Sequence, residues 1–172
     1  MLAAKRIPIG YELHVCSDAF ELGFGTCVYL RAKYASGNYF LKLFMAKSRI
    51  SPMRKLSMRI RLEMQGAVFG LHLSVAVITE LGLIVSKIVY WCDSQTVLQW
   101  IHSTSCIYHA FLAYRVNEIL ESSSASQWRH ILGDTNPSDD CSRGIPATHL
   151  TPHHRWFHGL DFFLSAAMFM AN

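Results

Sequence analysis

Residues 88–94 read Ile-Val-Tyr-Trp-Cys-Asp-Ser, and this stretch indicates the class of fold. An unbroken apolar run of this length predicts a strand buried on both faces, as in the middle of an α/β sheet. The run stops at Asp93, and Ser94 is a good N-cap for a short helix through Ile101. The position of the acid matters because open α/β sheets form their binding sites at the carboxyl ends of strands.

Three more strands are predicted before this one. Residues 11–17 alternate between two sets of side chains, which is the pattern of a strand, and the pattern ends at Asp18. Residues 26–30 and 39–46 also have strand composition, with turn-forming residues between the segments. Because the turns are short, these three strands are expected to form an antiparallel meander.

Helices are predicted between and after the strands. From Arg59 the apolar residues recur at steps of three and four, which predicts a long helix that ends at Gly82. A further helix is expected over 111–120 and a last strand over 127–132, and Pro137 suits the first position of a final short helix. This order of elements predicts an α/β fold.

Composition excludes several classes of protein. Of the 172 residues, 51% are apolar and 16% charged, which favours one folded domain over a disordered chain. The most apolar region, 67–91, is interrupted by His72, Glu80 and Lys87, whereas a membrane span needs about 20 apolar residues. We therefore expect no membrane partner.

The five cysteines indicate the cellular setting. They are odd in number and widely spaced, and no CxxC pair occurs, so neither a zinc ribbon nor a disulfide framework is suggested. Reduced thiols and an intracellular location, in a compartment that the sequence does not specify, are expected.

Charge is unevenly distributed along the chain. Between Leu22 and Leu62 there are nine bases and no acid, whereas the rest of the chain carries a net charge of −5. A basic block beside an acidic remainder is typical of a polyanion-binding face next to a separate acidic site. The alternative is a solvated hairpin face with no ligand.

Four acids lie where a metal site would need them. Asp18 and Asp93 each close a strand, Glu63 lies early in the long helix, and Asp139 opens the last helix. Clustered carboxylates repel one another unless a cation lies among them, and Mg²⁺ and Mn²⁺ prefer such oxygen ligands. Singly, each has another explanation, since a helix cap, a favourable dipole partner and a surface ion pair use the same residues. Together, in this order of elements, they favour a metal site.

The chain also resembles a known family over residues 12–164, nearly its whole length. The motifs that carry the resemblance are Glu12-Leu-His-Val-Cys-Ser-Asp-Ala19, Arg61-Leu-Glu-Met-Gln-Gly-Ala67, Trp91-Cys-Asp-Ser94, Asn136-Pro-Ser-Asp139 and Ser142-Arg-Gly144. They are similar to the ribonuclease H (RNase H) region of the Pol polyprotein of BEL/Pao-type retrotransposons. The segment before Glu63 departs from the family pattern, because it lacks the usual proline and is one residue longer.

The resemblance implies an RNase H-like fold, a five-stranded mixed sheet flanked by helices. It implies hydrolysis of the RNA strand of RNA–DNA hybrids by two Mg²⁺ ions, for which Mn²⁺ can substitute. The catalytic and metal-binding acids would be Asp18, Glu63, Asp93 and Asp139. Asp18 would bridge both ions, Glu63 and Asp93 would hold the ion near the leaving oxygen, and Asp139 the ion that activates water. Asp140 is the adjacent alternative to Asp139, and we expect Asp139 to be the ligand.

The resemblance also gives expectations about partners and boundaries. Nucleic-acid contacts are expected from Lys47, Arg49, Arg61, Ser94, Asn136 and Arg143. The domain itself is expected over 11–145, with flanks at 1–10 and 146–172, and the partners are the hybrid and the reverse transcriptase and integrase regions of a parent polyprotein. The chain has the character of a fragment or a diverged genomic copy. The alternative function is a catalytically inactive RNase H-like module that binds nucleic acid or serves as a scaffold.

Overall fold

The computed structural model describes residues 7–51, 59–103 and 110–164, and its centre is one five-stranded sheet. The strands are β1 (Gly10–Phe20), β2 (Gly23–Lys33), β3 (Tyr39–Ile50), β4 (Val85–Cys92) and β5 (Trp128–His130). They lie in the order β3-β2-β1-β4-β5. The first three pair antiparallel, whereas β4 runs parallel to β1 and β5 parallel to β4. The expected mixed sheet, with its antiparallel meander, is confirmed.

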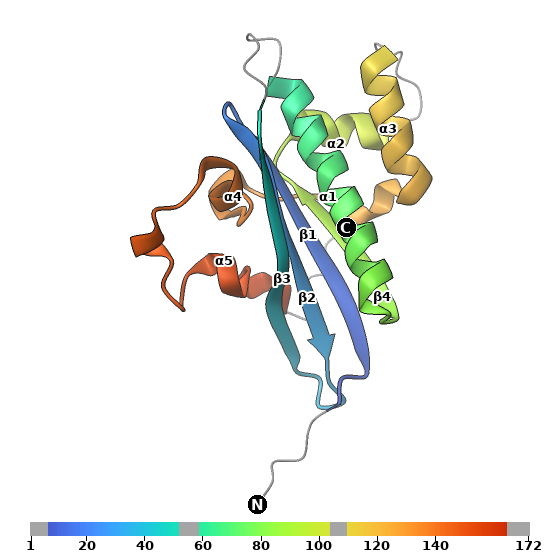
Figure 1. Ribbon diagram of the computed structural model, residues 1–172. Helices are drawn as coiled ribbons and strands as arrows, with labels where there is room; N and C mark the ends of the chain where they lie inside the picture. The colour runs from blue at the N-terminus through green and yellow to red at the C-terminus, as the bar shows by residue number, and fades with distance from the viewer. Residues whose placement is uncertain (1–6, 52–58, 104–109, 165–172) are drawn as a thin grey trace, which may run out of the picture.

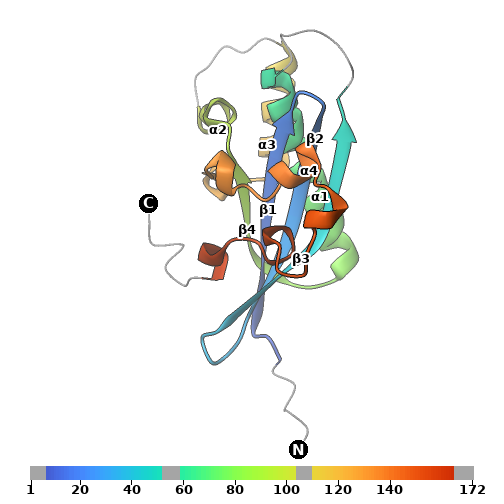
Figure 2. The same ribbon diagram turned by 90° about the vertical axis from the view of Figure 1, so that its left-hand side faces the viewer.

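Helices cover both faces of this sheet. The α-helices are α1 (Arg59–Leu81), α2 (Gln95–His102), α3 (Ala110–Ser122), α4 (Asp139–Arg143) and α5 (Arg155–His158). Short 3-10 turns lie at Ala125–Gln127, Gly133–Thr135, Ala147–His149 and Asp161–Leu164. Figure 1 shows α1, α2 and α3 on one side of the sheet and α4 and α5 on the other. Figure 2 shows the second side from the front, with α4 and α5 over the strands.

The larger core lies under α1. Leu13 and Val15 of β1 face Met64 and Leu71 of the helix, and all four side chains are at most 1% exposed. By length and composition alone, Ile60–Leu81 could cross a membrane, but 56% of its most apolar window is buried inside the fold. Its apolar character is accounted for by packing against the sheet.

The smaller core lies on the opposite face and depends on the end of the described chain. Phe163 is wholly buried against Tyr29 and Trp91, and the Tyr29 hydroxyl donates to the carbonyl oxygen of Trp156 at 2.8 Å. Residues 155–164, which lie in the expected C-terminal flank, therefore cover one face of the sheet.

Two local expectations need correction. The strand β1 continues to Phe20, so Asp18 lies inside it, at the point where its pairing with β4 has ended. The last helix begins at Asp139 with Ser138 as its N-cap, so Pro137 is not its first residue. The reason is that the side chain of Asn136 accepts hydrogen bonds from both the amide and the hydroxyl of Ser138, which holds this segment in a turn.

Candidate active site

Two carboxyl groups meet at the end of the paired strands β1 and β4. The parallel register pairs Ser17 with Cys92, so Asp18 and Asp93 are the next residues on neighbouring strands. They lie close enough that the charge of Asp18 and a hydrogen bond to it raise the pKa of Asp93. The meeting requires that the first and fourth strands be neighbours, and the sheet order fulfils this condition.

The closeness of the two acids changes the protonation of Asp93. Burial, the charge of Asp18 and the hydrogen bond to Asp18, in decreasing order, together raise the pKa of Asp93 from 3.8 to about 7. Glu63 adds a smaller contribution of the same sign. At neutral pH and without a cation, Asp93 is therefore only partly ionised.

Glu63 reaches this end of the sheet from the second turn of α1. Its Oε2 accepts a hydrogen bond of 2.6 Å from the hydroxyl of Ser94. The same hydroxyl caps α2 by accepting from the amide of Val97 at 3.3 Å. Ser94 thus holds the α1 acid beside the residue that follows β4, and the expected N-cap is confirmed.

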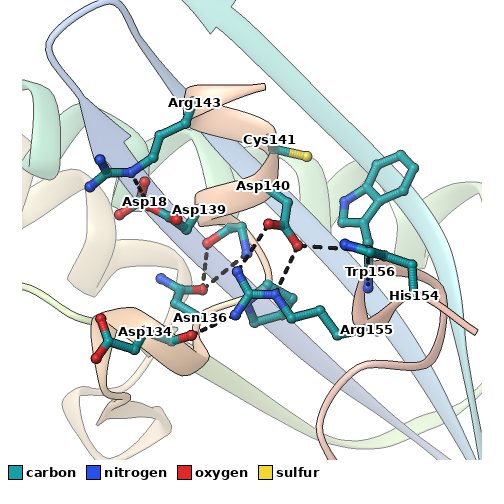
Figure 3. A network of polar contacts seen from close by, with 12 residues as sticks. Asp18, Asp134, Asn136, Asp139, Asp140, Cys141, Arg143, His154, Arg155 and Trp156 are labelled. Carbon is teal, nitrogen blue, oxygen red and sulfur yellow. Dashed lines mark hydrogen bonds and ion pairs between the residues drawn. The ribbon is translucent and has the colours of Figure 1, made fainter. Parts of the chain in front are cut away.

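The helix α4 brings the fourth acid and a cation. Figure 3 shows Asp139, Arg143 and Asp18 beside one another. Arg143 forms an ion pair with Asp139, and this bond raises the pKa of Arg143, with smaller contributions from the charges of Asp18 and Asp93. The guanidinium therefore lies within electrostatic reach of three of the four expected acids.

The neighbouring acid Asp140 belongs to a different network. Arg155 donates to both of its carboxylate oxygens, at 3.0 and 2.9 Å, and also to the backbone oxygen of Asp134 at 2.5 Å. Figure 3 shows this network on the side of α4 away from Asp18. The geometry thus favours Asp139, the expected residue, over Asp140 as a member of the acidic cluster.

The donor set fits a hard divalent cation, although its members are not gathered around one point. Asp18, Glu63, Asp93 and Asp139 supply only carboxylate oxygens, the ligands that Mg²⁺ and Mn²⁺ prefer. In residues 7–51, 59–103 and 110–164, no group of three or more His, Cys, Asp or Glu side chains is arranged so that it could hold a metal ion as it stands. Glu63 is turned toward Ser94 and Asp139 toward Arg143, so the fit rests on the Asp18–Asp93 pair.

Two residues that hold the site in place have roles that sequence reasoning missed. Ser142 donates a hydrogen bond to Asp18 Oδ2 from the far side of the sheet. Asn136, expected to contact nucleic acid, is wholly buried, and its amide donates to the Ser17 carbonyl oxygen at 2.9 Å. In this structure Asn136 anchors the loop to β1 and does not reach the surface. No local signal marks either contact, since each joins residues more than 100 positions apart.

The remaining expected nucleic-acid residues lie around the acidic end. Lys47 and Arg49 are exposed on β3, and the guanidinium of Arg49 lies 5.0 Å from the Phe69 ring centre of α1. Arg61 is exposed at the start of α1. Not every base of the basic block faces solvent, because Arg31 is wholly buried and pairs with Glu12 at 2.6 Å.

Comparison with family models finds a match to the Pao retrotransposon-like RNaseH-like domain over residues 4–94, which is more than half of the chain. The chain belongs to this family. The RNase H-like region that the sequence resembles is thereby confirmed. The matched residues include Asp18, Glu63 and Asp93, whereas Asp139 lies beyond them. A comparison with curated proteins finds no match.

Among solved structures, this Pao-type domain is similar to several RNase H domains at low identity. RNase H1 of the archaeon Halobacterium salinarum NRC-1 is 13% identical with a TM-score of 0.46, covering 76% of this chain and 92% of that one. LC11-RNase H1 in complex with an RNA/DNA hybrid is 10% identical with a TM-score of 0.48, and the match covers 76% of this chain and 91% of that one. The N-terminal RNase H domain of a Mycobacterium tuberculosis protein is 12% identical with a TM-score of 0.47, and the match covers 78% of this chain and 95% of that one.

Proposed function

We propose that this domain is an endonuclease that hydrolyses the RNA strand of RNA–DNA hybrids with two Mg²⁺ ions, which Mn²⁺ can replace. The observation that carries the proposal is the meeting of the buried Asp18 with the partly exposed Asp93 at the ends of β1 and β4, in a chain of the Pao RNase H-like family. A raised pKa in a carboxyl pair is unfavourable for a purely structural role, because two repelling acids lower stability.

The metal ions would be held first by Asp18 and Asp93, and by Glu63 and Asp139 once these exchange their present partners. When bound, such ions activate a water molecule and stabilise the leaving oxygen of a phosphodiester. Ser94 holds Glu63 ready for this exchange, since their hydrogen bond keeps the carboxylate at the end of β4. Arg143 is half-exposed, so its guanidinium can leave Asp139 for a phosphate oxygen.

Binding of the hybrid would use the bases around the acidic end. Lys47, Arg49, Arg61 and Arg143 are exposed and supply positive charge to phosphates, and Ser94 lies partly exposed beside Glu63. A Cβ atom built on Gly23 would lie 2.7 Å from the Arg49 backbone oxygen and 3.6 Å from that of Ser142. The basic end of β3 is thus adjacent to α4, which carries Asp139. Discrimination of RNA from DNA would come from contacts to 2′-hydroxyl groups.

The test is cleavage of an end-labelled RNA–DNA hybrid by the purified chain. We expect cleavage of the RNA strand with Mg²⁺ or Mn²⁺, none with EDTA, and none by Asp93→Asn with either ion. The matched control is Asp134→Asn, which changes an exposed acid outside the cluster and should cleave normally. An Asp93→Asn protein that still cuts at the native rate contradicts the proposed site.

A second candidate is a catalytically inactive module that binds nucleic acid. The observation that favours it is that Glu63 and Asp139 are already engaged by Ser94 and Arg143. Binding of the hybrid that weakens with salt, without cleavage in Mg²⁺ or Mn²⁺, would support this candidate. We further propose that the reverse transcriptase and integrase regions of a parent polyprotein are partners.

A further inference from the structure

A pair of cysteines joins α4 to the sheet beneath the acidic cluster. The Sγ atoms of Cys27 in β2 and Cys141 in α4 lie 3.4 Å apart, although the residues are 114 positions apart in the sequence. Cys27 is wholly buried and Cys141 is partly exposed. The indole of Trp156 also donates to the Cys27 sulfur, at 3.1 Å. The pair thus consists of one wholly buried cysteine and one that is partly exposed.

The backbone around the two sulfurs is closely packed. A Cβ atom built on Gly25 of β2 would lie 2.5 Å from the Cβ of Cys141 and 2.9 Å from its carbonyl carbon. The helix therefore rests directly on the strand, two residues before Cys27. A disulfide bond is about 2.05 Å long, so the sulfurs must approach by roughly 1.3 Å to form one.

We propose that Cys27 and Cys141 form an oxidation site, at which a peroxide converts the two thiols into a reversible disulfide that fixes α4 to β2. The Cys141 thiol first reacts with hydrogen peroxide to give a sulfenic acid and one water molecule. The Cys27 sulfur then attacks the Cys141 sulfur, the S–S bond forms, and the hydroxyl leaves with the Cys27 proton as a second water molecule. The peroxide is reduced and the two thiols are oxidised.

The modification would act on the proposed function through α4. Asp139 lies two residues before Cys141 in this helix, and Ser142, the next residue, donates to Asp18. Drawing Cys141 toward β2 shifts both contacts. Since a displacement of about 1 Å can cost about 100-fold in rate, we expect the oxidised protein to cleave the hybrid at least about tenfold more slowly. This consequence rests on the proposed function, whereas the disulfide itself does not.

The experiment uses the full chain with Cys106→Ser, which removes a thiol outside the described residues. The reduced protein is treated with hydrogen peroxide, free thiols are alkylated without reductant, and the digest is analysed by mass spectrometry. We expect a linked pair of peptides containing Cys27 and Cys141, a loss of two hydrogen atoms from the intact mass, and reversal by dithiothreitol.

Two variants test the assignment. Cys141→Ser should give no linked peptide, whereas Cys16→Ala, which removes a buried cysteine outside the pair, should give the same linked peptide as the parent. A folded parent protein in which peroxide yields only the sulfinic or sulfonic acid of Cys141, or a disulfide to another cysteine, overturns the proposal. So does a protein whose thiols all remain reduced at a peroxide excess that oxidises free glutathione.

Cleavage is measured separately on the same samples. A disulfide that forms without slowing hybrid cleavage overturns the coupling to the site and leaves the oxidation site intact. A chain that never cleaves the hybrid contradicts the proposed function, and the peptide mapping still decides the oxidation site. The two failures are therefore distinguishable.

Discussion

The burial of Asp93 beside Asp18 should be measurable as a loss of stability at neutral pH. The pKa of Asp93 is raised in the folded chain to about 7 from the ordinary 3.8. Between these pH values the unfolded chain has lost the proton that the folded chain keeps, so the free energy of unfolding falls as pH rises and levels off above about 7. Asp93→Asn removes the titrating group, so the variant should gain stability relative to the parent as pH rises.

The size of the gain follows from the pKa. Each pKa unit is worth about 1.4 kcal/mol, so the two units between pH 5 and 7 correspond to at most about 2.7 kcal/mol. Because Asp93 is partly exposed, screening by solvent reduces the expected gain to about 2 kcal/mol. Urea unfolding in EDTA at pH 5 and pH 8, followed by tryptophan fluorescence, measures the difference between variant and parent.

Two comparisons sharpen this measurement. Asp134→Asn, at an exposed acid, should change stability equally at both pH values. If the difference between Asp93→Asn and the parent is the same at pH 5 and pH 8, the pKa of Asp93 is not raised in the folded chain and the reasoning about the site is refuted. Added Mg²⁺ at pH 8 should stabilise the parent and have little effect on Asp93→Asn.

Three other substitutions test the packing and the cluster. Asn136→Ala should lower the free energy of unfolding by about 2–3 kcal/mol, since it leaves a buried carbonyl without its donor; a urea-unfolding change below about 0.5 kcal/mol contradicts the anchoring role. Phe163→Ala should lower the free energy of unfolding by about 3–5 kcal/mol in the same assay. The control Phe162→Ala, at a side chain that is 40% exposed, should lower it by about 1 kcal/mol. Equal losses would show that the second face of the sheet is not a true core. Arg143→Ala releases Asp139, so the Mg²⁺ midpoint in a thermal-shift titration should fall by about 2- to 5-fold; an unchanged midpoint would show that the ion pair does not compete with the metal.

The strands themselves could be predicted because their signals are local. The alternation over 11–17 and the apolar run over 88–92 each define a strand, and the neighbouring position of the two then brings Asp18 and Asp93 together. The role of Ser94 as a helix cap could also be predicted, since its hydroxyl accepts a hydrogen bond from the amide of Val97, only three residues further along the chain.

The contacts made by the end of the chain could not be predicted. Ser142 contacts Asp18, 124 positions away in the sequence, and Cys141 contacts Cys27, 114 positions away. The sequence pattern of a five-residue helix does not indicate which part of the sheet the helix packs against. The family resemblance led us to expect that Asn136 contacts nucleic acid, and only the packed structure shows that it is enclosed. Arg31 was counted with the basic block from its position in the sequence alone, although Glu12 pairs with it inside the sheet.

The burial of Phe163 has a consequence for how copies of such an element would decay in a genome. A stop codon between Arg143 and Trp156 would leave the codons of all four acids in the translated part of the gene. It would nevertheless remove the aromatic side chains that close one face of the sheet, along with the acceptor of the Tyr29 hydroxyl. Such a truncated copy would look intact when its acids are inspected, yet its product would expose Cys16, Tyr29 and Trp91 to water. Retention of the residues up to 164 is therefore a better sign of a foldable copy than retention of the acids alone.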